Sequence, residues 1–216
     1  MFANKVDAGK QLANTLKNFS DKDELIVLAI PRGGVVVGYE VARVLKVPLD
    51  IIIPRKIGAP NQPELAIGAV GQDGSVVLNK KVVAQLGVSR TYIEEERRRQ
   101  ELEIKRRLDK YRGRIPFPKL EGKKVIIVDD GVATGATLRA ALAFVRKQKV
   151  KELIIALPIG PLSSIQEFKK EVDQVICLLT PESFFAIGDF YKDFSQTSDE
   201  DVITLLDRNR EEINQL

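Results

Sequence analysis

The sequence VIIVDDGVATGAT, which runs from Val125 to Thr137, begins as an apolar run of strand length and ends as a turn rich in glycine and threonine. The residues that follow it place Leu138, Leu142 and Val145 at helical spacing. A strand, a tight turn and a helix therefore follow one another without a spacer. This order is the building unit of α/β proteins with a parallel sheet.

Similar apolar runs recur along the chain, at residues 24–30, 49–53, 124–128, 153–157 and 175–179. They are typical of strands that are buried on both faces of a parallel sheet. We therefore expect an α/β fold, with a mostly parallel, twisted sheet and helices on both of its faces. Ligands bind such sheets at the carboxyl ends of the strands.

The length of 216 residues suits one domain, so we expect a single domain over residues 1–216. Residues 12–19 predict an amphipathic helix that is broken at residues 20–23. Residues 198–216 predict a terminal helix, and Ser198 and Asp201 form a capping pattern at its start.

An insertion over residues 58–114 is expected before the strand at 124–128. Residues 58–77 are rich in glycine and proline and predict a flexible excursion that carries a hairpin. Residues 89–114 place glutamates four positions before arginines or lysines, as in Glu94–Arg98 and Glu103–Arg107, which predicts a long, exposed helix.

The composition excludes several kinds of chemistry. The chain has no histidine, so histidine-dependent triads and the commonest zinc ligand are absent. Cys177 is the single cysteine and lies in an apolar run, which indicates core packing and excludes an internal disulfide. The formal charge of +4 is weak evidence for nucleic acid binding, and no apolar stretch is long enough for a membrane span. We expect a cytoplasmic protein.

Two carboxylates and two hydroxyls mark the turn after the strand at 124–128. Glycine and threonine at a helix start direct backbone N–H groups and the Thr134 and Thr137 hydroxyls toward a phosphate. Asp129 and Asp130 repel a phosphate but accept hydrogen bonds from vicinal hydroxyls, or bind Mg²⁺. The alternative is an ordinary turn with a helix cap.

This stretch resembles the phosphoribosyl-pyrophosphate motif of type I phosphoribosyltransferases, in which an apolar strand and two acids precede a T-G-x-T loop. The resemblance implies that Asp129 and Asp130 contact the ribose hydroxyls and that the loop binds the 5-phosphate. Gly131 departs from the family, which usually has an apolar residue there. The expected loop residues are Gly131, Val132, Ala133, Thr134, Gly135, Ala136 and Thr137.

Two further segments resemble family loops. Pro31, Arg32, Gly33 and Gly34 follow the run at 24–30, where paired glycines let backbone N–H groups approach an anion, as in the family's pyrophosphate loop. The alternative is a plain strand-to-helix turn.

Arg55 and Lys56 close the run at 49–53, and cations at that point would neutralise a pyrophosphate leaving group. A solvated basic pair is the alternative. The expected catalytic residues are therefore Arg55, Lys56, Asp129 and Asp130, and Mg²⁺ is the expected cofactor, with Asp129 and Asp130 as its ligands.

The acceptor is not named by the motifs. Members of the family that use six-oxopurines carry an acid at the position of Ala133, so the resemblance argues against hypoxanthine and guanine. Residues 180–191 are the candidate hood, where Phe184 or Phe185 would stack on a planar base. Aromatic pairs in loops also serve as packing anchors, which is the alternative for both rings.

The sequence thus predicts a transferase that moves phosphoribosyl from 5-phosphoribosyl 1-pyrophosphate to a nitrogenous acceptor, as a homodimer. Two alternatives stay open. One is a regulator that senses the same donor or a nucleotide and contacts nucleic acid through the helix at 90–114. The other is a hydrolase in which water replaces the acceptor.

Overall fold

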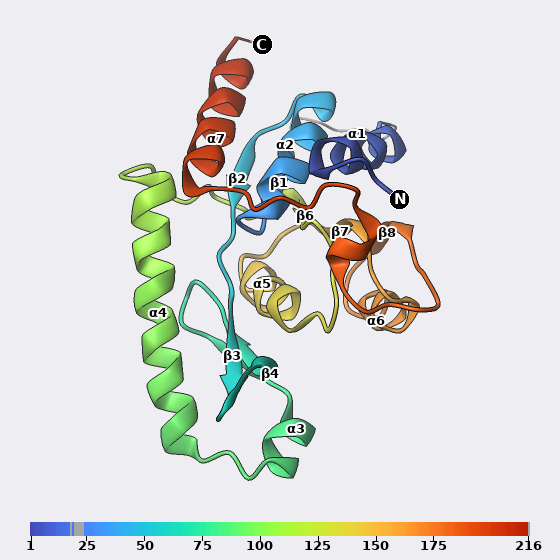
Figure 1. Cartoon of the computed structure of the whole chain (residues 1–216). Helices are drawn as coiled ribbons and strands as arrows, with labels where there is room; N and C mark the ends of the chain where they lie inside the picture. The colour runs from blue at the N-terminus through green and yellow to red at the C-terminus, as the bar shows by residue number, and fades with distance from the viewer. Residues whose placement is uncertain (18, 20–23, 216) are drawn as a thin grey trace. The chain divides into compact units, whose positions relative to one another are not determined.

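The computed structural model describes residues 1–17, 19 and 24–215, so the break expected at residues 20–23 lies outside the described residues (Figure 1). The chain forms two compact units. The first comprises residues 1–52, 118–134 and 149–216, and the second comprises residues 53–117 and 135–148.

The first unit contains a five-stranded, entirely parallel sheet in the order β2-β1-β6-β7-β8. Its strands are β1 (Leu25–Ala29), β2 (Leu49–Ile51), β6 (Lys124–Val128), β7 (Glu152–Ile159) and β8 (Gln174–Leu179). The predicted α/β fold with a mostly parallel sheet is confirmed, and each strand falls on one of the five apolar runs. β2 ends two residues before the apolar run does, at Ile51, which lies opposite Ala29, the last residue of its partner β1.

The strand order fixes where a ligand can bind. β1 continues along the chain toward β2 on one side of the sheet, whereas β6 continues toward β7 on the other. β1 and β6 are direct neighbours, with Ala29 opposite Val128 at their carboxyl ends. The loops after these two strands therefore leave the sheet side by side, at the point where doubly wound folds bind their ligands.

Helices flank this sheet. α1 (Lys5–Leu16) packs on α2 (Gly33–Leu45), which begins four residues after β1 ends. α6 (Leu162–Phe168) contacts β8, and the short 3-10 helix η2 (Ile187–Phe190) lies in the predicted hood. Within the described residues, no helix has both the length and the apolar character that crossing a bilayer requires.

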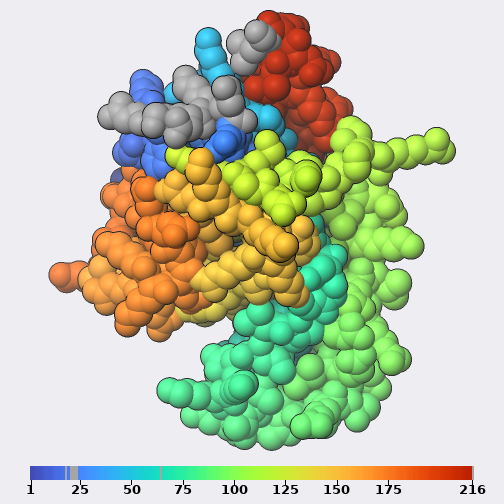
Figure 2. Space-filling model, turned by 180° about the vertical axis from the view of Figure 1, so that it is seen from behind, coloured from blue at the N-terminus to red at the C-terminus, as the bar shows by residue number. Residues whose placement is uncertain are grey.

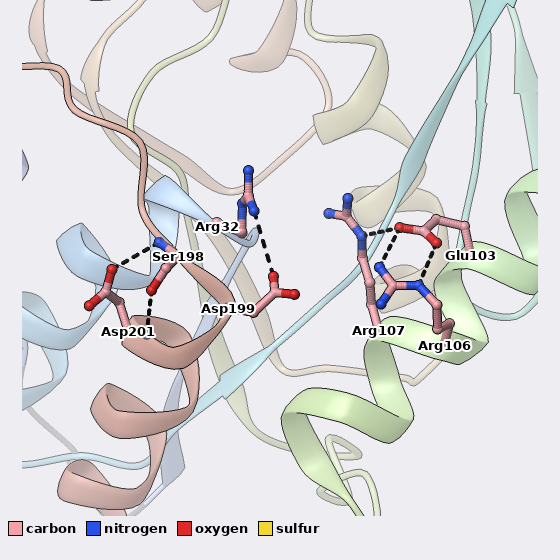
Figure 3. Close-up of polar contacts among 7 residues, drawn as sticks. All are labelled: Arg32, Glu103, Arg106, Arg107, Ser198, Asp199 and Asp201. Atoms are coloured by element: carbon pink, nitrogen blue, oxygen red, sulfur yellow. Dashed lines mark hydrogen bonds and ion pairs between the residues drawn. The ribbon is translucent and has the colours of Figure 1, made fainter.

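The C-terminal helix α7 (Asp199–Asn214) begins as the sequence predicted. Ser198 Oγ accepts a hydrogen bond from Asp201 N (3.0 Å), and Asp201 Oδ2 accepts one from Ser198 N (2.8 Å), which completes a capping box (Figure 3). Asn209 is 1% exposed on the inner face of α7 and bonds the backbone on both sides of Pro48: it accepts from Leu49 N (2.7 Å) and donates to Val47 O (3.3 Å). In Figure 2 the red atoms of α7 lie beside light-blue atoms of the region that contains α2 and β2, which both contact α7.

The second unit is built around an antiparallel sheet in the order β3-β4-β5, from β3 (Arg55–Ala59), β4 (Gln62–Val70) and β5 (Val76–Leu78). The hairpin predicted within residues 58–77 is thus present as β4 and β5. Its remaining elements are the helices α3 (Lys80–Gln85), α4 (Arg90–Arg112) and α5 (Ala136–Arg146).

Helix α4 is the long, charged helix that the sequence predicted over residues 89–114. Glu103 binds Arg106 (2.8 Å) and Arg107 (2.7 Å) (Figure 3). Glu94 binds Arg98 (3.4 Å), so both of the ion pairs named from the sequence form. The helix is not exposed all round, because Ile104 and Tyr111 are among its buried residues.

We predict that Asn209→Ala destabilises the protein by about 2–3 kcal/mol, because it leaves the buried N–H of Leu49 and C=O of Val47 without their partner. Urea denaturation followed by circular dichroism measures the change. Glu211→Ala, at an exposed position of the same helix, is the control and should stay within about 0.5 kcal/mol of the original protein. Equal stability of the two variants would contradict the assignment.

Candidate functional site

The loops after β1 and β6 are in direct contact. Ile30 N donates a hydrogen bond to Val128 O (2.9 Å), which continues the pairing of the two strands beyond their ends. A side chain at Gly33 would overlap the Asp130 carboxylate, and one at Gly34 would come within 2.9 Å of Asp129. Only glycine fits at either position, so the Pro31–Gly34 segment and the two carboxylates form one packed unit.

Burial governs the charge of the two carboxylates. It raises the pKa of Asp129 well above its ordinary value, and the neighbouring Asp130 charge raises this pKa further. Burial also raises the pKa of Asp130, against the opposing effect of the Lys5 ammonium. Because two close carboxylates resist joint ionisation, hydroxyl donors or a cation that enters the site will stabilise the doubly charged form.

Asp129 and Asp130 can hold Mg²⁺ only together with oxygen atoms of a bound ligand, because two carboxylates alone are too few ligands for a site made by the protein. Within residues 1–17, 19 and 24–215, no group of three or more histidine, cysteine, aspartate or glutamate side chains could hold a metal ion. Mg²⁺ commonly uses one or two carboxylates together with phosphate oxygens of a substrate. Asp129 and Asp130 fit that arrangement, in which the bound molecule supplies the other ligands.

Residues of the predicted hood hold the start of the loop in place. Tyr191 donates its hydroxyl hydrogen to Asp130 O (2.6 Å). A Cβ at Gly131 would lie 2.7 Å from Ile187 and 2.9 Å from Ile159. The position where the family usually has an apolar side chain is therefore filled by these two isoleucines, which explains the departure at Gly131.

The remaining loop residues follow in order. Val132 N donates to Ile159 O (2.9 Å), Ser164 Oγ donates to Ala133 O (2.8 Å), and Ala133 and Thr134 are exposed at the end of the first unit. Gly135 has a φ of 74° as the N-cap of α5, a left-handed conformation that favours glycine, and Ala136 and Thr137 form the first turn in the second unit.

The two helices that follow these loops, α2 and α5, each lack a side-chain cap at the N-terminus within the described part of the chain. Side chains of Asn4, Asn79, Ser89 and Ser198 cap the N-termini of α1, α3, α4 and α7. The N-cap residues of α2, α5 and α6, as the structure describes them, make no side-chain cap, and of these three helices α2 and α5 follow the two loops. Helices bind phosphates at N-termini of this kind, through backbone N–H groups of the first turn.

Arg32 lies at the N-cap of α2 and faces the start of the C-terminal helix. Its Nη1 lies 3.7 Å from Asp199 Oδ1, and both side chains are partly exposed (Figure 3). Such a pair adds little stability but limits the positions that the guanidinium takes.

Arg55 and Lys56 are in the second unit, and one part of their prediction was wrong. They begin antiparallel strand β3 rather than close parallel strand β2, because the parallel pairing ends at Ile51, opposite the last residue of β1. Arg55 is half-buried and donates from Nε to Gln100 Oε1 of α4 (2.9 Å). Burial, and then the Arg107 charge, lower its pKa. Contact with a leaving group stays a prediction for both residues.

The two candidate base-stacking rings have different surroundings. Phe184 stacks on Phe190, with 5.7 Å between ring centroids and 17° between ring planes, and it packs against the buried cluster around Phe2 and Tyr191. Phe185 is 91% exposed. Phe184 thus has the surroundings of a packing anchor, whereas Phe185 has a free face.

A cavity of about 370 Å³ in the first unit borders both Gly33 and Asp130. Its lining residues are Lys5, Arg32, Gly33, Asp130, Phe194, Gln196 and Thr197. Lys5 was not predicted as a site residue from the sequence, although one signal was present. Lys5 lies at helical spacing from Ala8 and Leu12 on the buried face of α1, where a lysine is rare unless its charge is paired.

Comparisons with known proteins agree with this geometry. A family model described as a phosphoribosyl transferase domain matches residues 71–195. Curated proteins of Mycobacterium tuberculosis strains CDC 1551 and H37Rv, whose names assign them provisionally to the phosphoribosyl transferases, are 45% identical over 209 residues. These alignments cover 96% of this chain but 47% of each relative, so the chain spans about half the length of the curated relatives it matches.

A solved structure is also similar over nearly the full chain. The crystal structure of a protein from Thermus thermophilus is 38% identical, with a TM-score of 0.79, and the match covers 95% of this chain and 97% of that one. The arrangement of elements described above is therefore shared with an experimentally determined protein.

We predict that Gly131→Ala costs about 1–3 kcal/mol of unfolding free energy, because the new methyl group overlaps Ile187. Ile187→Ala should recover part of this cost in the double variant, since it removes the overlapping atoms. Chemical denaturation of the four proteins in this cycle measures the coupling. If the loss of unfolding free energy in the double variant equals the sum of the losses in the two single variants, Ile187 does not pack against residue 131.

Proposed function

We propose that this chain, which belongs to the phosphoribosyl transferase family, transfers phosphoribosyl from 5-phosphoribosyl 1-pyrophosphate to a nitrogenous acceptor and releases pyrophosphate. The observation that carries the proposal is the contact of Gly33 and Gly34 with Asp130 and Asp129. This contact brings the Pro31–Gly34 segment, which suits an anion, and the Asp129–Asp130 pair, which suits hydroxyl groups, to one edge of the sheet.

Each part of the site then has a separate task. Asp129 and Asp130 accept hydrogen bonds from the ribose hydroxyls, which favours their charged forms. The open N-terminus of α2, after Pro31 and Arg32, binds the diphosphate. Loop residues 131–137 bind the 5-phosphate through backbone N–H groups, with the Thr134 and Thr137 hydroxyls as further donors.

The reaction breaks the bond between ribose C1 and the diphosphate oxygen and forms a bond between C1 and the acceptor nitrogen. Positive charge develops at C1, and negative charge develops on the departing pyrophosphate. The protein lowers the barrier by placing the reactants in line and by stabilising the leaving group with cations. We assign that stabilising role to Arg32, Arg55 and Lys56, and no side chain acts as a nucleophile.

Mg²⁺ is the proposed cofactor, and Asp129 and Asp130 are the residues that would hold it. It would supply positive charge that neutralises the diphosphate oxygens. The raised pKa values of both carboxylates agree with a site that is completed by a cation or by hydroxyls.

We propose a nucleobase or related amine as the acceptor. The family resemblance at Ala133 argues against six-oxopurines, and the exposed ring of Phe185 is the available stacking surface in the hood. The ion pairs within α4 support a solvated structural helix over a surface that binds nucleic acid. A homodimer and a cytoplasmic location stay predictions.

Isothermal titration calorimetry with 5-phosphoribosyl 1-pyrophosphate tests donor binding. We expect saturable binding that requires Mg²⁺, and a loss of affinity of about tenfold or more in Asp130→Asn, because a charged acceptor of ribose hydrogen bonds is removed. Asp207→Asn, on an exposed turn of α7, makes the same charge change outside the site and should bind normally. Absence of donor binding by the unmodified chain would rule out the proposed function.

Pyrophosphate release with a panel of nucleobases tests the transfer step. We expect release that depends on one acceptor and is lost in Asp130→Asn. Release at the same rate without any acceptor identifies a hydrolase. Donor binding with no release for the whole panel, together with salt-sensitive binding to DNA or RNA, identifies a regulator.

A further inference from the structure

Lys5 is a buried cation next to the proposed donor site. It is 7% exposed, and it reaches the cavity between Gly33 and Asp130 from the first turn of α1. Its Nζ donates to Ser195 O (2.7 Å) and lies 3.9 Å from the centre of the Phe194 ring. Burial lowers the pKa of Lys5, whereas the carboxylates of Asp130 and Asp193 raise it.

Without a bound ligand, the burial of the Lys5 ammonium costs free energy. A lysine in the first turn of a helix opposes the helix dipole, and burial of an ammonium is unfavourable unless it is paired. The backbone oxygen of Ser195 and the ring of Phe194 compensate part of this cost. An ammonium has three donor hydrogens, so Lys5 can bind further oxygens in the cavity.

The remaining side chains that line the cavity indicate which chemical class of ligand fits there. Arg32, the Gln196 amide and the Thr197 hydroxyl add donors, and Asp130 is the one carboxylate in the lining. Two cations and several neutral donors against one carboxylate suit an oxyanion. The cavity also touches Gly33, at the open N-terminus of α2.

We propose that Lys5 is a further binding residue for the diphosphate oxygens of the donor, beside the N-terminus of α2 to which the proposed function assigns them. The inference rests on the proposed function. A ribose whose hydroxyls reach Asp130 carries its diphosphate at C1, next to those hydroxyls, and the cavity begins at Asp130 and extends to Gly33 and Lys5. The N-terminal helix thereby supplies a cation to a site whose other parts follow β1 and β6.

Three ligands separate this role from the alternatives. 5-Phosphoribosyl 1-pyrophosphate has both the ribose hydroxyls and the diphosphate, inorganic pyrophosphate has only the diphosphate, and ribose 5-phosphate lacks it. Calorimetry with each ligand in the presence of Mg²⁺ is performed on the unmodified chain, on Lys5→Met and on Lys5→Gln. Lys10→Met, at an exposed position of α1, is the control.

We expect both Lys5 variants to bind the donor and inorganic pyrophosphate about 10- to 100-fold more weakly, which is the range for loss of a charge-assisted hydrogen bond. Binding of ribose 5-phosphate should change less than about twofold, and Lys10→Met should bind all three ligands normally. Circular dichroism checks the fold. If Lys5→Met unfolds, Lys5→Gln carries the test, because its amide can still donate to Ser195 O.

Two results would overturn the inference. Unchanged affinity of folded Lys5 variants for pyrophosphate would show that the cavity serves another oxyanion, such as that of an acidic acceptor. Equal weakening for ribose 5-phosphate and for the donor would show that Lys5 acts only through Asp130. Failure of the proposed function is seen separately, since the unmodified chain would then bind no donor at all.

Discussion

The contact between the paired glycines at the start of α2 and the paired carboxylates at the end of β6 is the constraint on which the site depends. It requires β1 and β6 to be neighbours, as they are in the strand order β2-β1-β6-β7-β8. It also excludes any side chain at Gly33 and Gly34. A segment suited to anions and a pair suited to hydroxyls are thus held at van der Waals distance by backbone packing, before any ligand binds.

This close packing has an electrostatic cost. Two carboxylates lie near each other in a partly desolvated position, and burial raises the pKa of both. Lys5 opposes part of that shift at Asp130. Sites with perturbed carboxylates of this kind are where proteins bind cations and polar substrates, because the ligand supplies the missing stabilisation.

The sequence was sufficient to predict those features that depend on residues close together in the chain. The parallel strands followed from apolar runs, the capping box of α7 from Ser198 and Asp201, and the carboxylate loop from a local motif. Contacts between distant residues were not predictable: Lys5 meets Ser195 across 190 positions, and Tyr191 meets Asp130 across 61. Arg55 and Lys56 begin an antiparallel strand instead of closing a parallel one, since the length of β2 depends on where its distant partner β1 ends.

The bond from Lys5 to Ser195 also bears on how the protein matures. The segment that lines the cavity with Phe194 and Thr197 leaves the ribosome long after α1, β1 and β6 have been made. Contacts of such sequence separation form slowly, since the intervening chain must be ordered first. The wall of the cavity beside Lys5 therefore depends on a contact of far greater sequence separation than the contact between the glycine and carboxylate loops on its other side.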